Sequence, residues 1–559
     1  MKRFVLLLLL MASTVLMFAQ TFERSETLYI SGAAWGPPND WNPFITWSKA
    51  NTSGTVGLIY ETLFMYDPLT DKYIPWLASE GKWTNKNTYE LKLRDGITWT
   101  DGKPLTIDDV KFTFELGKKF TGVYYSNMWK YLKSIDKVGA NGLKFNFTNK
   151  PLVQEFMNNL YNIAIVPKHL WENRRESDVT SGANEKPIGS GPYMYESHTT
   201  DRNVYVRNDN WWGTKILKYK PAPKRIVDIR FSSNSVALGS VLKGELDLSN
   251  NFLPGIAALV DQGYVSTYYP TAPYMISANT AVLFLNTTKS PMDDAAFRKA
   301  LAHAINVDEI IKVAFAGLVK AANPTGLLPT LDKYVDKDTV AKLGFSYNVE
   351  KAKKLLADAG YKDINGDGFV ETPKGAKIEL NVTCPFGWTD WMEAIKVISK
   401  SCKAAGIKVE AKFPDYGAWN EALVSGTFDM TLNNWAGMSN TPWTLYNLLF
   451  RHPIEKTMGS GNFGRYNNPT LFALVDDLAA ASDEASAKAI CKKIQEIMLT
   501  DLPMIPLWYN GLWAQYSNDV WTGWPSDAKD APKLLPCSWA GYWQMGGLLT
   551  LCNIKPAKK

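Results

Sequence analysis

Short hydrophobic strands alternate with helical stretches over nearly the whole chain, and this alternation restricts the fold more than any other feature. Residues 378–383 (IELNVT) favour a strand, residues 389–405 a helix, and residues 407–413 (IKVEAKF) a second strand. A strand, a helix and a strand in succession are typical of a βαβ unit in a parallel sheet. Apolar residues also recur near a helical period from 297 to 316. We therefore predict an α/β fold.

The length of 559 residues exceeds what one hydrophobic core can organise, so we expect two or three domains. No low-complexity linker and no internal repeat separates parts of the chain. The domains are therefore expected to be joined tightly, by several crossings of the chain.

The amino terminus has the layout of a secretory signal peptide. Lys2 and Arg3 precede an apolar run at residues 4–11, and Ala19 is a suitable last residue before a cleavage site. The apolar run is shorter than the about 20 residues that a membrane-spanning helix needs. We expect residues 1–19 to be removed and the mature chain to be periplasmic. Because the first cysteine is Cys384, we expect no lipid anchor.

The charges and cysteines exclude several classes of protein. Without Lys2 and Arg3 the mature chain carries 59 basic and 55 acidic residues, a net charge of +4, and no basic stripe that would indicate nucleic-acid binding. Five cysteines are too few for a disulfide scaffold. In an oxidising compartment they allow two disulfides at most, and Cys537 with Cys552 is the favoured pair because they are close in the sequence.

Tryptophan is unusually frequent and unevenly placed. The chain has 21 tryptophans, with none between Gly213 and Gly387, five in 388–443 and six from Trp508 onward. Core packing explains any single tryptophan, but the clustering favours a shared aromatic surface.

Six blocks of sequence stand out along the chain. They are 89–110 (YELKLRDGITWTDGKPLTIDDV), 188–193 (IGSGPY), 298–305 (RKALAHAI), 347–360 (YNVEKAKKLLADAG), 426–430 (GTFDM) and 502–507 (LPMIPL). In this order they resemble the peptide/oligopeptide class of ABC-transporter extracellular solute-binding proteins, family 5. The resemblance covers roughly residues 28–520.

The resemblance implies a two-lobed periplasmic binding protein fold with an extra domain, three domains in all. Ligand would be enclosed between the lobes as they close about two chain crossings, expected near 282–285 and 505–507. The implied parts are residues 1–19 as signal peptide; 20–62 with 188–284 and 506–559 as lobe one; 63–187 as its extra domain; and 285–505 as lobe two.

The sequence departs from the family pattern where peptide-binding members hold the ammonium group of a peptide. In those members a Trp after the GxFD strand is followed three residues later by an Asp. Here Trp435 is kept, but Met438 stands at the position of the carboxylate. An ammonium group buried without a counter-charge costs several kcal/mol, which disfavours a dedicated peptide binder.

Sugar recognition requires aromatic faces and paired amide or carboxylate groups, and the sequence has both at positions that match the family's cleft. By resemblance we expect a site for β-linked cello- or manno-oligosaccharides. Tyr416 and Trp435 match aromatic contact positions of the family. The expected ligand-binding residues are Trp35, Asn39, Asp40, Trp41, Trp388, Trp391, Tyr416, Asn434, Trp435, Asn440, Trp443, Tyr509, Asn510 and Trp513.

A segment at 363–371 (DINGDGFVE) reproduces the start of a calcium loop. Asp363, Asn365 and Asp367 supply oxygens at loop positions one, three and five, but Lys374 stands at position twelve, so Glu371 would have to substitute. A metal-free turn and a structural calcium site are both open. No cofactor is otherwise expected.

Two functions remain as alternatives. An oligopeptide-binding protein of the same fold would have to hold the ammonium group on Asp40 or Asp415 instead. A secreted glycoside hydrolase would use two of the 55 acidic residues, although no GxSxG or HExxH motif occurs. The resemblance favours a monomeric, non-enzymatic protein that binds oligosaccharide and delivers it to permease subunits in the inner membrane.

Overall fold

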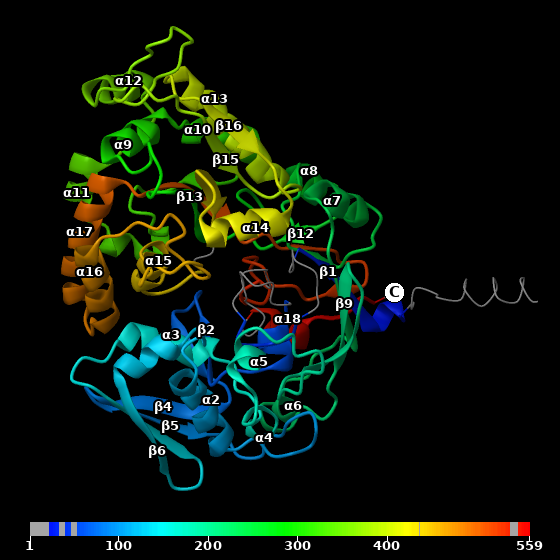
Figure 1. The fold of residues 1–559 in the computed structure, drawn as a ribbon. Helices are drawn as coiled ribbons and strands as arrows, with labels where there is room; N and C mark the ends of the chain where they lie inside the picture. Colours follow the sequence, from blue (N-terminus) through cyan, green and yellow to red (C-terminus); the bar gives the residue numbers. More distant parts are fainter. Residues whose placement is uncertain (1–21, 33–39, 46–52, 435–436, 537–545, 559) are drawn as a thin grey trace, which may run out of the picture.

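The computed structural model describes residues 22–32, 40–45, 53–434, 437–536 and 546–558 (Figure 1). The predicted signal peptide and Cys537 lie outside these residues, and the four described cysteines are free thiols. Within the described part of the chain, no helix combines the length and the apolar character needed to cross a membrane. Two large mixed sheets and one smaller antiparallel sheet organise the molecule.

The first large sheet has seven strands from three distant parts of the chain. They are β1 (Thr27–Ser31), β8 (Tyr193–His198), β9 (Arg202–Arg207), β10 (Arg225–Ile229), β11 (Leu248–Ser249), β12 (Ser266–Thr267) and β19 (Gln515–Tyr516). Their order is β12-β19-β11-β1-β10-β9-β8, and the central β1 pairs in parallel with β10 and β11. The helices α7 (Asn234–Leu242) and α8 (Ile256–Asp261) follow β10 and β11.

The extra domain is an antiparallel sheet, a hairpin and several helices inserted between β1 and β8. Its main elements are the hairpin β2 (Phe64–Asp67) and β3 (Lys72–Pro75), the strands β4 (Ala78–Asn85), β5 (Thr88–Leu93), β6 (Leu132–Val138) and β7 (Gly142–Phe147), and the helices α2 (Ile107–Lys119) and α3 (Val153–Asn162). A capping box starts α2: the Thr106 amide donates to an Asp109 carboxylate oxygen over 2.8 Å. The other Asp109 oxygen accepts from the Lys168 amide over 2.8 Å, which ties α2 to the next part of the domain.

The second large sheet has six strands, in the order β14-β18-β13-β17-β15-β16. They are β13 (Ser277–Leu285), β14 (Lys320–Ala321), β15 (Leu380–Thr383), β16 (Val409–Lys412), β17 (Met430–Asn433) and β18 (Met504–Gly511). β15 pairs in parallel with β16 and β17, and α13 (Thr389–Ala404) connects β15 to β16. The predicted βαβ unit is therefore confirmed.

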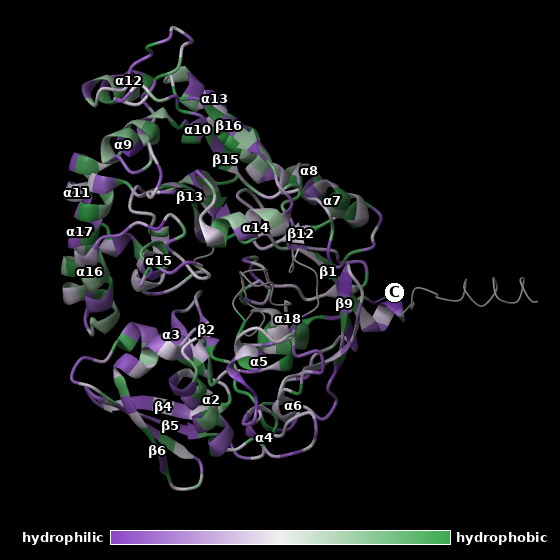
Figure 2. Cartoon of the chain, viewed as in Figure 1, coloured by the Kyte–Doolittle hydropathy of each residue, from purple (hydrophilic) through white to green (hydrophobic). Residues whose placement is uncertain are grey.

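The predicted helix over 297–316 is two helices, α9 (Ala295–Ala304) and α10 (Val307–Phe315). Ile305 has extended backbone, and the Asn306 side chain accepts from the Glu309 amide over 3.0 Å as the N-cap of α10. Apolar residues recur on both sides of this break because both helices contribute buried side chains. Further helices of this lobe are α11 (Lys337–Leu343), α12 (Val349–Asp358), α14 (Tyr416–Ser425), α15 (Trp443–Leu449), α16 (Pro469–Ala480) and α17 (Glu484–Asp501). Figure 2 shows hydrophobic and hydrophilic residues side by side along α16 and α17, as in helices with one buried face.

The described strands change from one large sheet to the other between Thr267 and Ser277 and again between Gly511 and Gln515. The segments 282–285 and 505–507, where crossings were expected, lie inside β13 and β18. These two strands pair with each other within the second sheet, with Val282 opposite Pro506 and Leu283 opposite Ile505. The connections between the sheets therefore run through 268–276 and 512–514.

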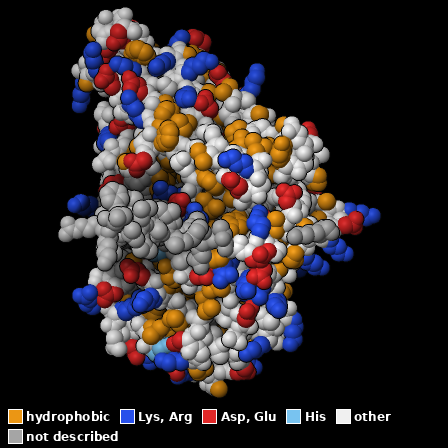
Figure 3. Space-filling model, turned by 90° about the vertical axis from the view of Figure 1, so that its right-hand side faces the viewer, with side chains coloured by type: hydrophobic (Ala, Val, Ile, Leu, Met, Phe, Trp, Pro, Cys, Tyr) orange, Lys and Arg blue, Asp and Glu red, His pale blue; other side chains and the backbone are white. Residues whose placement is uncertain are grey.

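The surface carries both signs of charge. On the face shown in Figure 3, Lys and Arg side chains lie interspersed with Asp and Glu, and apolar side chains appear between them. No part of this described face gathers a basic track of the kind that follows a nucleic-acid backbone.

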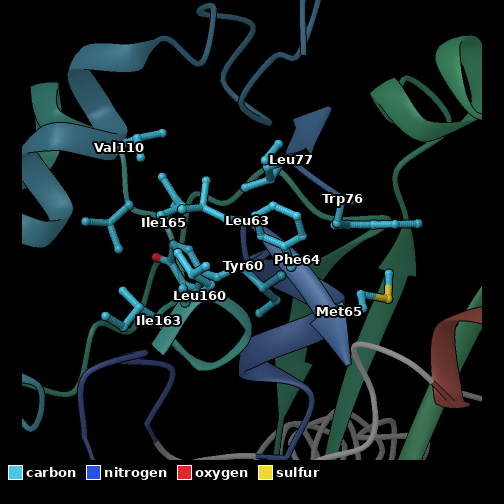
Figure 4. Close-up of a cluster of buried hydrophobic side chains, with 14 of the residues drawn as sticks. Tyr60, Leu63, Phe64, Met65, Trp76, Leu77, Val110, Leu160, Ile163 and Ile165 are labelled. Atoms are coloured by element: carbon cyan, nitrogen blue, oxygen red, sulfur yellow. The ribbon is translucent and has the colours of Figure 1, made fainter. Parts of the chain in front are cut away.

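The hydrophobic cores follow the sheets. One core joins the first sheet to the extra domain, and Figure 4 shows Leu63, Phe64, Leu77, Leu160 and Ile165 converging within it. Alternate residues of β13 enter two cores. Ala281, Leu283 and Leu285 enter one that also takes in residues of α7 and α8, whereas Val282 and Phe284 enter another within the second lobe. The extra domain therefore belongs to the body of the first lobe.

Three of the tryptophans have a structural task around one buried carboxyl group. The Glu61 side chain accepts from the indole nitrogens of Trp76 (2.9 Å), Trp211 (3.2 Å) and Trp212 (2.7 Å), and from the Ser190 hydroxyl (2.7 Å). Burial raises the pKa of Glu61 to about 7, although these four donors act in the opposite direction. Ser190 belongs to the 188–193 block, so its hydrogen bond to Glu61 joins this block to the segment around residue 61 in the first lobe.

Candidate ligand-binding site

The carboxyl ends of three strands of the second sheet, β15, β16 and β17, bring several predicted residues to one edge. Trp388 is the N-cap of α13 after β15, Tyr416 starts α14 after β16, and Asn434 follows the last residue of β17. Ligands of open α/β sheets bind at the carboxyl ends of strands, in the crevice outside them. This edge is therefore the starting point for a binding site.

An aromatic cluster of Trp388, Trp391, Tyr416 and Trp419 forms here. The Trp388 ring centroid lies 4.9 Å from that of Trp391, 6.2 Å from Tyr416 and 5.9 Å from Trp419. Trp391 and Trp419 are buried, whereas Trp388 and Tyr416 are half-buried and keep aromatic surface toward solvent. The structure thus brings three predicted residues together and adds Trp419. Its indole nitrogen donates to Thr431 on β17 over 2.9 Å, a contact that spacing alone did not reveal.

An amide cluster of Asn279, Asn433, Asn434 and Asn510 lies on β13, at the end of β17 and on β18. Asn434 donates from its side chain to Asn279 over 3.1 Å, and Asn510 stands opposite Asn279 in the strand pairing. All four are at most 3 % exposed. The side-chain nitrogens of Asn279 and Asn433 have no hydrogen-bond partner among the described residues. Buried amide donors normally have an acceptor, so these two unpaired donors are candidates for a hydrogen bond to a solute oxygen.

Asn434 and Asn510 were predicted, whereas Asn279 and Asn433 were not. Asn433 could have been found, because it immediately precedes Asn434 at the end of the strand. Asn279 is one polar residue beside the apolar run of β13, and only the pairing of β13 with β18 shows that it faces Asn510.

Two further predicted residues of β18 and its continuation serve the core. The Tyr509 hydroxyl donates to the Leu327 carbonyl and accepts from the Asn323 amide, each over 2.9 Å. Trp513 packs edge-on against Phe252 with ring centroids 5.1 Å apart. Both side chains are buried, so they support the walls rather than offer a free face.

Asn440 and Trp443 lie on the side of the second lobe that faces the extra domain. Trp443 lines a cavity of about 1010 Å³ between α2, α3 and the segment 443–476. The cavity wall is rich in amides and aromatic rings, among them Asn127, Asn158, Asn159, Asn162, Asn447, Tyr124 and Trp129. Asn440 lines a smaller cavity of about 220 Å³ together with Asp71 and Lys333.

The predicted residues near the amino terminus belong to the first lobe. Trp41 is buried, with its ring centroid 4.5 Å from Tyr195 and 5.0 Å from His198. Asp40 accepts from the Asn42 amide over 2.7 Å, and burial raises the pKa of Asp40 to about 6. The predicted residues Trp35, Asn39 and Trp435 lie outside the described residues.

Met438 sits in an apolar environment. It packs against a small cluster that contains Tyr268, Ile276, Leu512 and Leu535, all buried. A carboxylate at this half-buried position would be partly desolvated against apolar side chains, which costs free energy unless a counter-charge is present.

The predicted calcium loop is closed by its own hydrogen bonds. The two Asp363 carboxylate oxygens accept from the amides of Gly366 (2.7 Å) and Gly368 (2.9 Å), and Glu371 accepts from the Ile364 amide (2.8 Å). Asn365 and Asp367 likewise accept from amides within the loop. Among the described residues, no group of three or more His, Cys, Asp or Glu side chains is placed to hold a metal ion.

A family model described as "Bacterial extracellular solute-binding proteins, family 5 Middle" matches residues 72–455. The protein belongs to this family. The family 5 match confirms the resemblance found in the sequence blocks, and it establishes a substrate-binding component of an ABC importer. Its members bind solutes rather than transform them.

This family 5 protein is similar to a periplasmic oligopeptide-binding protein of an oligopeptide ABC transporter from Thermotoga maritima. The two chains are 48% identical, over 96% of this chain and 100% of the other. The TM-score is 0.93 for the crystal structure of the T. maritima protein with bound mannohexaose and 0.88 for a second crystal structure of it. The arrangement of this family 5 chain is thus closer to the mannohexaose-bound one.

More distant relatives share the fold. The oligopeptide-binding protein AppA of Bacillus subtilis is 26% identical, over 85% of this chain and 84% of its own length. A dipeptide-binding protein of Escherichia coli is 24% identical, over 89% of this chain and 91% of its own. The structure of AppA with a nonapeptide matches with a TM-score of 0.76.

Proposed function

We propose that the solute of this family 5 protein is an oligosaccharide, built from β-linked gluco- or manno-units, which the protein binds between its lobes for import. We further propose that the protein acts as a monomer in the periplasm, after removal of residues 1–19. The observation that carries the proposal is the apolar setting of Met438, at the position where peptide-binding members place a carboxylate.

A peptide brings a charged ammonium group that must be paired when it is buried. Met438 packs against the cluster that contains Tyr268 and Leu512, and its side chain carries no charge. Asp415, one of the two alternative acceptors, is exposed and caps α14, accepting from the Ala418 amide over 3.0 Å. Asp40, the other alternative, lies in a part of the first lobe where burial disfavours its charged form.

A sugar needs apolar ring faces and hydrogen-bonding amides, and both occur at the second sheet. Trp388 and Tyr416 offer half-buried aromatic surface, and stacking contributes about 0.5–1.5 kcal/mol per ring beyond area burial. Asn279 and Asn433 offer amide donors that lack an acceptor among the described residues. Micromolar binding requires about 8 kcal/mol, which several such contacts can supply together.

The T. maritima relative supports the same solute class, because its crystal structure contains mannohexaose although it is described as oligopeptide-binding. Oligopeptide binding is the second candidate, and the descriptions of AppA and of the E. coli dipeptide-binding protein favour it. Glycoside hydrolysis has no comparable support.

A thermal-shift screen tests the proposal. Purified mature protein is heated with cello-, manno-, laminari- and xylo-oligosaccharides and with di- to pentapeptides, because a solute that binds only the native state raises the melting temperature. We expect stabilisation by one sugar series and no shortening of that sugar on prolonged incubation. Stabilisation by peptides alone would refute the proposal, and release of monosaccharide would show an enzyme.

A further inference from the structure

Two loops, one from each lobe, meet beside the aromatic cluster. The loop from β10 to α7 belongs to the first sheet, and the loop from β15 to α13 belongs to the second. The Asn234 amide donates to the Gly387 carbonyl over 3.0 Å. The approach is so close that a Cβ atom on Gly387 would lie 2.3 Å from the Ser232 carbonyl oxygen.

A chain of buried hydrogen bonds runs through this contact. Ser31, at the end of β1, donates to the Asn251 side-chain oxygen over 2.9 Å, and Asn251 donates to that of Asn234 over 3.3 Å. Asn234 donates in turn to an Asp390 carboxyl oxygen over 3.2 Å, in the first turn of α13. The first sheet is therefore bonded to the second lobe through four polar side chains.

Asp390 is buried at this junction without an ion-pair partner among the described residues. Its exposed fraction is 5 %, and across the lobes its carboxyl group accepts a hydrogen bond from the neutral Asn234 side-chain amide. Among the described residues, Cys384 is a titratable group whose pKa is affected by the charge of Asp390. Burial raises the pKa of Cys384 well above its usual value, so this side chain stays a neutral thiol. Thr389 and Asn251, the other side chains bonded to Asn234, do not titrate.

We propose that Asn234 and Asp390 form a latch between the two lobes, and that the latch closes as the Asp390 carboxylate takes up one proton from solution. When the lobes separate, the carboxyl group meets water and releases that proton. The latch rests on the two-lobed arrangement and is independent of the solute class. It lies close to the aromatic cluster, because Trp388 is the N-cap of α13 and Asp390 belongs to the first turn of the same helix.

The direction of the pH effect follows from burial. Burial raises the pKa of Asp390 to about 7, whereas an Asp in water titrates near 3.9. The closed form therefore binds the proton more tightly, so closure is favoured as the pH falls through about 7 and disfavoured above it. Between pH 8 and pH 6 the closure equilibrium constant should rise about tenfold.

Small-angle X-ray scattering of the ligand-free mature protein tests the latch without any solute. We expect wild-type protein to be more compact at pH 6 than at pH 8. Asp390→Asn is a neutral isostere of the protonated carboxyl, so this variant should be compact at both pH values. Asn234→Ala should be less compact at both. Asp338→Asn, in the exposed first turn of α11, is the matched control and should follow wild type.

Calorimetry with mannohexaose gives a second readout. We expect the Kd of wild type to fall about tenfold from pH 8 to pH 6. Asp390→Asn should bind at pH 8 as tightly as wild type at pH 6. An Asp390→Asn protein that keeps the wild-type pH response in scattering would overturn the latch. If scattering shows the predicted response but mannohexaose does not bind, the latch stands and the proposed solute is wrong.

Discussion

Asn434 donates a hydrogen bond from its side chain to the side-chain oxygen of Asn279 over 3.1 Å, which joins the end of β17 to β13. The bond fixes the Asn279 side chain so that its nitrogen has no acceptor within the described part of the protein. An unpaired buried donor costs about 1–3 kcal/mol, and a solute oxygen can recover that free energy on binding.

Asn279→Ala should therefore weaken solute binding more than it weakens the fold. We expect the Kd for the solute to rise at least tenfold, and the free energy of unfolding to fall by only about 1 kcal/mol, because Asn434 loses one bond. Calorimetry and urea denaturation of the same preparation measure both. Equal affinity of the variant and wild type would show that Asn279 does not face the solute.

Tyr416 should contribute through its ring face. Tyr416→Ala is expected to raise the Kd by about 5- to 20-fold, whereas Tyr416→Phe keeps the ring and should change it less than 3-fold. Tyr347→Ala removes an exposed ring elsewhere on the second lobe and serves as the control. A large loss in Tyr416→Phe would instead assign the contribution to the hydroxyl group.

Glu61 should be essential for the first lobe. In Glu61→Gln, an amide nitrogen replaces an oxygen that accepts from two donors, such as Trp212 and Ser190, so donors would face donors. We expect the free energy of unfolding to fall by about 2–4 kcal/mol. Glu80→Gln, on exposed surface of β4, is the matched control. A variant as stable as wild type in urea denaturation would contradict this role for the three tryptophans.

Asp228, on β10, should make the first lobe less stable at alkaline pH. It is 2 % exposed, neither carboxylate oxygen has a hydrogen-bond partner among the described residues, and burial raises the pKa of Asp228 to about 7. Since the folded state binds the proton more tightly than the unfolded state, this contribution to stability is present at low pH and is lost as the pH rises from about 4 to about 7.

Asp228→Asn removes that titration. We expect the variant to be about 1–3 kcal/mol more stable than wild type at pH 8 and the difference to shrink at pH 5. Urea denaturation at both pH values measures it. The same stability difference at both pH values would mean that Asp228 is not buried in its charged form.

The sequence predicted the parts of the site that follow from local order along the chain. The resemblance to the family implied that Trp388, Trp391 and Tyr416 belong to one cleft, and their ring centroids are 4.9–6.2 Å apart along Trp391–Trp388–Tyr416. Local order follows from strand and helix periodicity, which is encoded in neighbouring residues.

Other features depend on contacts between distant segments and were not predictable in this way. The runs at 282–285 and 505–507 were expected to carry the crossings between the lobes, but both lie within one sheet because β13 pairs with β18. Similarly, Trp76, Trp211 and Trp212 look like any clustered tryptophans until Glu61 is seen between them. Asp390 showed no signal in the sequence, because its importance comes from Asn234, 156 residues away.

The most direct test of the central claim is isothermal titration calorimetry of the mature wild-type protein with mannohexaose and, in parallel, with a tetrapeptide. The account predicts saturable binding of the oligosaccharide with a micromolar or lower Kd, and no heat of binding with the peptide. Saturable binding of the tetrapeptide, with none of mannohexaose or of the related cello-oligosaccharide, would contradict the account and make this an oligopeptide-binding protein.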